Sequence, residues 1–164
     1  MDRLTLEKLY LRHRQGLFTL ALAVAGGRSA AEDAVQDACA RLLASPRDAV
    51  DGDPAAYLFA AVRNAAVDQR RRRSAAGAAL AGASIYNGRR LSTDEPGRDA
   101  EVDGRIRAAL AALPEEQREA VSMRIYGGLT FEQMAAATGE PLSTVASRYR
   151  RAIERLRDEL RGLE

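Results

Sequence analysis

The residues from Thr130 to Leu156 carry the clearest pattern for binding chemistry, because their spacing is that of a helix-turn-helix. Ala135 is small where two helices would cross closely, and Gly139 can supply the left-handed backbone of the turn. Val145 would then bury the second helix against the first. A generic helical hairpin could carry the same three residues by coincidence, and on spacing alone it remains the alternative.

The polar side chains of the second helix favour DNA over a plain hairpin. Opposite the buried stripe, that helix carries Thr144, Ser147, Arg148, Arg151 and Arg155. Side chains near the start of a recognition helix reach base edges, whereas arginines further along the helix meet phosphates. These residues therefore predict a nucleic-acid-binding face.

A second basic region ends an earlier helix, where Arg70–Arg73 form an unbroken run after Arg63 and Asn64. Such a run is often a solvated surface, and arginines at the C-terminus of a helix also complement its dipole. Arg63 and Arg70 could equally line one side of a nucleic-acid backbone. Both interpretations stay open from the residues alone.

Carboxylates gather on a different helix. Glu32, Asp33, Gln36 and Asp37 point away from its apolar positions and would form the docking edge for a protein partner. The alternative is a surface that only keeps the protein in solution, and the residues alone favour that alternative.

This chain has few residues of the types that form catalytic or metal-binding sites. With one cysteine, Cys39, and one histidine, His13, it cannot build a thiolate–imidazole zinc site, and no glycine-rich phosphate loop is present. Both residues fall in or near apolar stripes, so we expect them in the core, as we do Tyr10, Tyr57 and Phe59. We expect no catalytic residues, no metal and no cofactor.

The elements that must position these residues are all helical, and the predicted fold class is all-α. Three helices are expected in residues 4–73: the first stops at Gly26, a capping box at Ser29–Glu32 opens the second, and Pro54 opens the third. Residues 74–100 read as a flexible linker with a short helical stretch at 78–81. Residues 101–164 contain further short helices, one of them from Glu115 to Tyr126, and a long final helix.

Composition bounds the remaining possibilities. The chain has 164 residues, of which 46% are hydrophobic and 29% charged, with a net charge of +2. No stretch approaches the ~20 apolar residues of a membrane-spanning helix, and the N-terminus lacks a secretory pattern. An intracellular, soluble protein of one or two small domains is expected.

Several motifs together resemble the bacterial sigma factors. Glu32–Asp37, Tyr57–Phe59 and Arg63–Arg72 resemble their second conserved domain, and Leu113–Arg118, Gly128–Ala135 and Thr144–Arg148 resemble their fourth. Both sets occur in the right order in a chain of this length. That organisation is similar to the extracytoplasmic function (ECF) group of the sigma-70 family, which lacks the extra domains of housekeeping sigma factors.

The resemblance implies a domain organisation of 1–73 for docking on core RNA polymerase and for opening the minus-ten element, 74–100 for the linker, and 101–164 for the minus-thirty-five element. It assigns polymerase binding to Glu32, Asp33, Gln36, Asp37 and Arg41. It assigns minus-ten contacts to Arg63, Asn64, Arg70, Arg71 and Arg72, with the loop Pro46–Asp53. It assigns minus-thirty-five contacts to Ser143, Thr144, Ser147, Arg148 and Arg151.

The partners implied by the resemblance are core RNA polymerase (its clamp-helix coiled coil and flap), promoter DNA and an anti-sigma factor. The protein is then a non-enzymatic, cytoplasmic initiation factor, monomeric when free. The alternative is a stand-alone helix-turn-helix regulator with no polymerase role. Such regulators usually dimerise on paired half-sites, and no sustained apolar heptad offers a dimer interface here.

Overall fold

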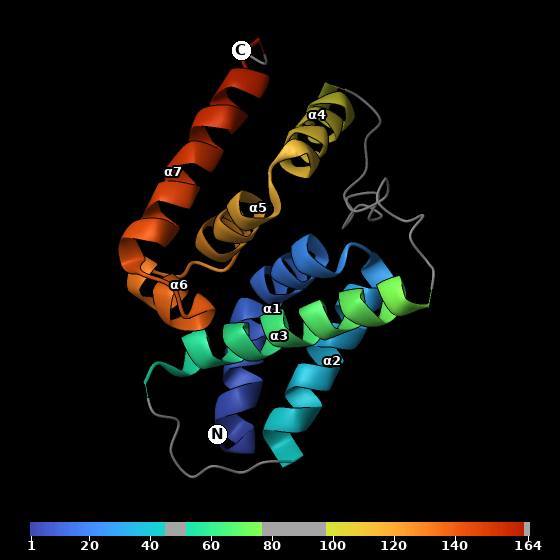
Figure 1. The fold of residues 1–164 in the computed structure, drawn as a ribbon, viewed down its shortest axis with the longest axis vertical. Helices are drawn as coiled ribbons and strands as arrows, with labels where there is room; N and C mark the ends of the chain where they lie inside the picture. Colours follow the sequence, from blue (N-terminus) through green and yellow to red (C-terminus); the bar gives the residue numbers. More distant parts are fainter. Residues whose placement is uncertain (45–51, 77–97, 163–164) are drawn as a thin grey trace.

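The computed structural model describes residues 1–44, 52–76 and 98–162, with side chains described from residue 101 in the last range. Every regular element in these ranges is a helix, which confirms the all-α prediction (Figure 1). The elements are α1 (Arg3–Ala25), α2 (Arg28–Ala44), α3 (Pro54–Ala75), α4 (Arg98–Ala112), α5 (Glu115–Val121), the π-helix η1 (Ser122–Tyr126), α6 (Phe131–Thr138) and α7 (Leu142–Glu159). None of the helices in the described part is long and apolar enough to cross a membrane.

The ends of α1, α2 and α3 follow local chemistry. The Asp2 side chain caps α1, and Gly26 ends that helix at φ 82°, as its position in the sequence predicts. Asp53 caps α3 by accepting a hydrogen bond from the amide of Ala56, and Pro54 occupies the first turn. The predicted capping box at Ser29 is wrong: α2 already begins at Arg28, whose guanidinium donates to Glu32.

The core of the first three helices contains Leu17, Leu20, Leu58, Phe59 and Val62, all fully buried. The predicted burial of Phe59 is therefore confirmed. The same prediction was wrong for Tyr10 and Tyr57, which are 38% and 37% exposed. Both lie at the border of an apolar helix face, where periodicity alone does not separate core from surface.

In the C-terminal part, the helix expected from Glu115 to Tyr126 widens into a π-helix for its last five residues. Gly127 and Gly128 then end it, the latter at φ 68°. The predicted capping box at the next helix is confirmed, because the Thr130 and Gln133 side chains each bond to the other's backbone amide.

The helix-turn-helix forms as its spacing predicts. Gly139 ends α6 in the left-handed conformation at φ 72°, and Val145 on α7 is 1% exposed. Further along α7, Ala152 packs with Leu110 and Leu113 of the α4 segment and with Val121 of α5. This second, smaller core fixes the long helix against the rest of the C-terminal part.

The two parts of the chain pack against each other. Figure 1 shows α5 and α6 beside α1 and α3, and Leu129 and Met134 belong to the same buried cluster as Phe59. The predicted linker has helical ends, because α3 continues to Ala75 and α4 begins at Arg98. Residues 77–97, including the predicted stretch at 78–81, lie outside the described residues.

Candidate nucleic-acid and partner-binding surfaces

The start of α7 presents the predicted base-reading residues. The helix begins at Leu142 directly after Pro141, which places Ser143 and Thr144 in its first turn. Ser143 and Arg151 are exposed, whereas Thr144 and Ser147 are half-buried. The buried stripe of Val145 and Ala152 faces the protein. The predicted side chains thus gather on one accessible stretch at the beginning of the helix.

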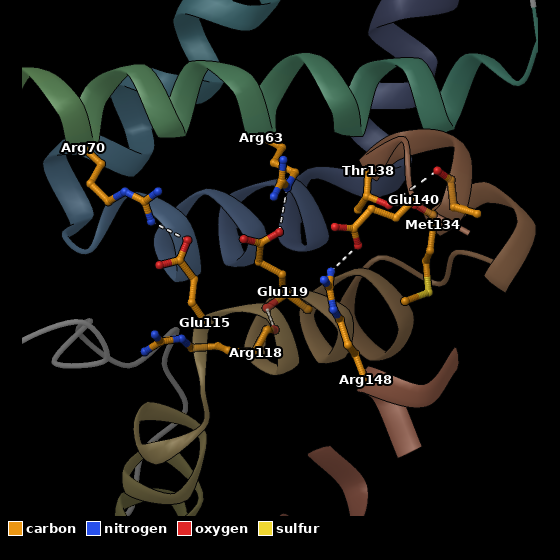
Figure 2. Close-up of polar contacts among 11 residues, drawn as sticks. Arg63, Arg70, Glu115, Arg118, Glu119, Met134, Thr138, Glu140 and Arg148 are labelled. Carbon is orange, nitrogen blue, oxygen red and sulfur yellow. Dashed lines mark hydrogen bonds and ion pairs between the residues drawn. The ribbon is translucent and has the colours of Figure 1, made fainter. Parts of the chain in front are cut away.

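Arg148 differs from the other predicted residues of α7. Its guanidinium forms an ion pair with Glu140 in the turn between α6 and α7 (Figure 2). About a third or less of each side chain is exposed. Arg148 therefore ties α7 to the preceding turn of the helix-turn-helix, and it also lies near the outer face of α7.

The predicted arginines of α3 are not equally accessible. Arg63 points toward α5, where its Nε atom donates to Glu119 at 2.6 Å, and Arg70 forms a second ion pair with Glu115, one helical turn earlier on α5 (Figure 2). Arg71, by contrast, lies exposed on the same helix. Two of the predicted nucleic-acid contacts are therefore occupied by carboxylates of the C-terminal part.

Burial sets the protonation of the Arg63–Glu119 pair. Glu119 is only 3% exposed, and this burial raises the pKa of its carboxyl, with the opposing effect of Arg63 too small to cancel it. The charge of nearby Glu115 raises it further. Burial acts to lower the pKa of Arg63, but its hydrogen bond and attraction to Glu119 outweigh burial and raise that pKa. Arg63 is therefore firmly protonated in this pair, whereas the ionised form of Glu119 is disfavoured by its burial.

The remaining predicted residues of α3 are exposed: Asn64, Arg71 and Arg72. The loop preceding α3 lies outside the described residues over its predicted stretch from Pro46 to residue 51. Its last residue, Asp53, both caps α3 and accepts from the Gln133 side chain of α6 at 3.0 Å. Those bonds lower the pKa of the Asp53 carboxyl.

The acidic edge of α2 lies on the surface. Glu32, Asp33 and Gln36 are exposed, and Asp37 accepts a hydrogen bond from Gln69 of α3. Arg41 is exposed and reaches Asp68 at 3.5 Å. The five predicted polymerase-binding residues thus share one helix, and two of them also tie that helix to α3.

A groove between α1 and α2 adjoins this acidic edge. Its lining is Arg3, Leu6, Glu7, Tyr10, Val35, Gln36, Cys39 and Leu43. Tyr10 and Leu43 leave large parts of their apolar surfaces exposed, and Leu4 and Leu11 do so nearby on α1. An apolar strip bordered by carboxylates is typical of a surface that a helix of another protein can cover.

His13 lies at the contact between the two parts of the chain. Its Nδ1 atom lies 3.0 Å from the carbonyl oxygen of Gly127, and its ring meets Phe59 edge-on. A carbonyl can only accept, so Nδ1 carries the proton. Burial raises the pKa of the Cys39 thiol, which disfavours the reactive thiolate. Among the described residues, no group of three or more acidic, histidine or cysteine side chains is placed to hold a metal.

The contacts that the sequence did not predict are those of Glu119 with Arg63, of Glu115 with Arg70, and of Gly16 with Gly127. Each of these contacts joins residues that are more than 40 positions apart in the chain. Nothing in the sequence indicated these contacts at Glu119, because that residue lies in a short helix of mostly charged and polar residues.

Family models match both parts of the chain. Residues 9–76 match Sigma-70 region 2, and residues 103–156 match Sigma-70, region 4. These matches cover α1 from residue 9 onward, α2, α3 and the helix-turn-helix, in that order.

Curated relatives show the same relationship. The chain is 32% identical to the ECF RNA polymerase sigma factor SigL of Mycobacterium tuberculosis over 163 residues, covering 96% of this chain and 90% of that one. It is 30% identical to SigE of Mycolicibacterium smegmatis over 159 residues, and 43% identical to RpoE of Cereibacter sphaeroides over 58 residues. The chain spans 61% of that SigE and 32% of that RpoE.

Two solved structures share the fold. The sigma factor RpoE of Bartonella quintana, in complex with the anti-sigma factor NepR, gives a TM-score of 0.70 at 26% identity, over 95% of this chain and 96% of that one. CnrH, in complex with the cytosolic domain of CnrY, gives a TM-score of 0.66 at 22% identity, over 97% and 89%. The all-helical fold, with region 2 followed by region 4, defines a two-part sigma-70-type protein, and that family consists of non-enzymatic proteins. The chain belongs to the ECF RNA polymerase sigma factors.

Proposed function

We propose that this chain binds core RNA polymerase and directs it to specific promoters. The observation that carries the proposal is the presence, in one chain and in order, of a region 2 helical domain and a region 4 helix-turn-helix with an accessible polar face. A stand-alone regulator would explain the second without the first. The protein carries out no catalysis of its own in this proposal and acts in the cytoplasm, where the chromosome and polymerase are.

The minus-thirty-five element is read by α7. Ser143, Thr144, Ser147, Arg148 and Arg151 lie along the first three turns of that helix. Hydroxyl and guanidinium groups at such positions bond to base edges or phosphates in the major groove. Arg148 would read DNA while its pairing with Glu140 holds its orientation.

The minus-ten element is bound by α3 and the loop before it. Asn64, Arg71 and Arg72 are accessible for the separated strands, and Arg63 and Arg70 join them once their carboxylate partners move away. Guanidinium groups suit this role because they pair with phosphates through a planar fork of donors.

Polymerase docks on α2. Glu32, Asp33, Gln36, Asp37 and Arg41 supply a mainly acidic edge, and the neighbouring groove supplies apolar surface for a helix of the polymerase clamp. Charge complementarity would then steer the encounter, while the groove adds buried area.

An anti-sigma factor is a further partner in this proposal. The solved structure of the sigma factor RpoE with the anti-sigma factor NepR supports it, since it shows a protein of this fold bound to such a regulator. The chain is monomeric when free in this account, and it needs polymerase to place its two DNA-binding parts at the right separation.

In vitro transcription tests the proposal. Core polymerase with and without the protein is given a library of promoter fragments from the genome that encodes it. We expect initiation only when the protein is present, at fragments sharing a two-part motif. Absence of polymerase binding, together with specific duplex binding by the protein alone, would contradict the proposal and favour the stand-alone regulator.

A further inference from the structure

The contact between the two parts of the chain brings opposite charges together in two ion pairs. On α3, Arg63 and Arg70 lie two turns apart, and on α5 Glu119 and Glu115 lie one turn apart, each facing its arginine (Figure 2). All the carboxylates come from the C-terminal part and all the arginines from the N-terminal part. The arginines are those for which a DNA role is proposed above.

We propose that the free chain adopts a closed form in which the carboxylates of Glu115 and Glu119 occupy Arg70 and Arg63 in place of DNA phosphates. The inference rests on the proposed function, because it assigns these arginines to nucleic acid. DNA cannot reach them until α5 leaves α3. The two parts must therefore separate before the minus-ten surface is complete.

The closed form also depends on close packing between the two parts of the chain. Gly16 of α1 and Gly127 approach so closely that a Cβ atom built on Gly16 would lie 2.4 Å from the Cα of Gly127. Gly127 in turn lies against the ring of Phe59, and its carbonyl accepts from His13. Gln133 of α6 bonds to Asp53 at the start of α3. Contacts of this kind require both parts to be docked in one arrangement.

The ion pairs suit release better than permanent attachment. The Glu119 carboxyl loses hydration in the closed form, as its raised pKa indicates, so its pairing with Arg63 contributes little net stability. The Arg70–Glu115 pair is about 40% exposed on both sides, and exposed pairs are weak. A DNA phosphate or a polymerase surface that favours separation can therefore displace these carboxylates.

Gly16→Ala tests the inference without changing any charge. A Cβ atom there meets backbone atoms of the C-terminal part, so it must push that part away, while alanine favours the helix α1 itself. Gly16→Gln makes the same change with a bulkier, helix-compatible side chain. Far-UV circular dichroism should show unchanged helicity in both variants, and small-angle scattering should show a larger radius of gyration.

Neighbouring arginines then provide a matched pair. Arg70 is engaged by Glu115, whereas Arg71 is exposed, and both are replaced by alanine in the wild-type and the Gly16→Ala chains. The probe is fluorescein-labelled single-stranded dT20, and the measurement is the slope of log K against log salt. Each phosphate contact contributes about −0.7 to that slope for single strands.

The inference predicts an asymmetry between the two residues. In the wild-type chain, Arg71→Ala makes the slope shallower by about 0.7 and Arg70→Ala leaves it unchanged; in the Gly16→Ala chain, each makes it shallower by about 0.7. Equal effects of Arg70→Ala in both backgrounds would overturn the inference, as would an unchanged radius of gyration in both Gly16 variants. If Arg71→Ala has no effect in either background, the proposed DNA role of α3 fails, and the inference fails with it.

Discussion

The two predicted DNA-binding surfaces are in different states in the same molecule. On α7, Ser143 and Arg151 lie open to solvent, and the ion pair of Arg148 is internal to the helix-turn-helix. On α3, Arg63 and Arg70 are paired with carboxylates that belong to the other part of the chain. The predicted DNA-binding residues of α7 are accessible in this arrangement. Arg63 and Arg70 of α3 become accessible only if α5 moves away from α3.

The difference shows what a motif can and cannot say. The helix-turn-helix is local, so the residues that form it also determine which of its side chains face outward. The availability of the α3 arginines depends on Glu115 and Glu119, about 50 residues away along the chain. An arginine can therefore be accessible or paired according to which residues long-range packing places opposite it.

The largest expected effect comes from the residue that joins both regions. Phe59 is fully buried, contacts Gly127 and meets His13 edge-on. We expect Phe59→Ala to lower the free energy of unfolding by about 3–5 kcal/mol, since a cavity opens where the two parts meet. Chemical denaturation measures it. The control is Tyr57→Ala, two residues away but 37% exposed. An equal loss of stability there would contradict the assignment of Phe59 to the contact between the two parts of the chain.

The next effect concerns the docking edge, which neither DNA surface includes. We expect Asp33→Arg to weaken binding to core polymerase roughly tenfold or more, because it places a positive charge where the proposed contact needs a negative one. The folded state should be unchanged within about 0.5 kcal/mol, since Asp33 is exposed. Fluorescence anisotropy of labelled protein against core polymerase measures the affinity. Glu101→Arg on α4 makes the same charge change elsewhere, and an equal loss there would mean that net charge alone matters.

The open surface on α7 should respond without any conformational step. We expect Arg151→Ala to reduce promoter-dependent transcription about tenfold, in line with about 1–3 kcal/mol for a well-placed base contact, and to leave polymerase affinity unchanged. Arg150→Ala, which removes an exposed arginine from an adjacent face of the same helix, serves as the control. Equal losses in the two variants would indicate general attraction to DNA instead of a specific contact.

The smallest expected effect is a pH dependence of closure. The closed form raises the pKa of Glu119 above its ordinary value of 4.5, so the closed form binds a proton more readily than the open form. The contribution of Glu119 to closure is therefore fully present below pH 4.5 and is lost as the pH rises through the raised pKa. The radius of gyration of the wild-type chain should therefore rise slightly over that range, while the closed form remains the main one. Glu119→Gln removes the titrating group, and a variant with the same pH dependence would contradict this origin.

Much of the fold follows from local signals. Gly26, Pro54 and Gly139 mark helix boundaries because glycine and proline restrict the backbone wherever they occur, and the Thr130–Gln133 capping box needs only its own turn. The capping box at Ser29 failed because the same residue types also fit inside a first turn that starts one residue earlier. The π-helix at Ser122–Tyr126 has no residue pattern that separates it from an α-helix.

The sequence predicts which residues belong to the candidate site, but it does not predict which residues they contact. The outward residues of α7 follow from helical periodicity, since Val145 fixes which face is buried. The pairing of Arg63 with Glu119 and the close approach of Gly16 to Gly127 depend on how two separately formed cores dock. No spacing along the chain encodes that docking.

The central claim is that the free chain is closed, and small-angle X-ray scattering of the wild-type and Gly16→Ala chains tests it most directly. A compact chain of 164 residues has a radius of gyration of about 15 Å. The account predicts a wild-type value near that of one compact body and a clearly larger value, with two separated scattering bodies, for Gly16→Ala. A wild-type chain already as extended as the variant would contradict it.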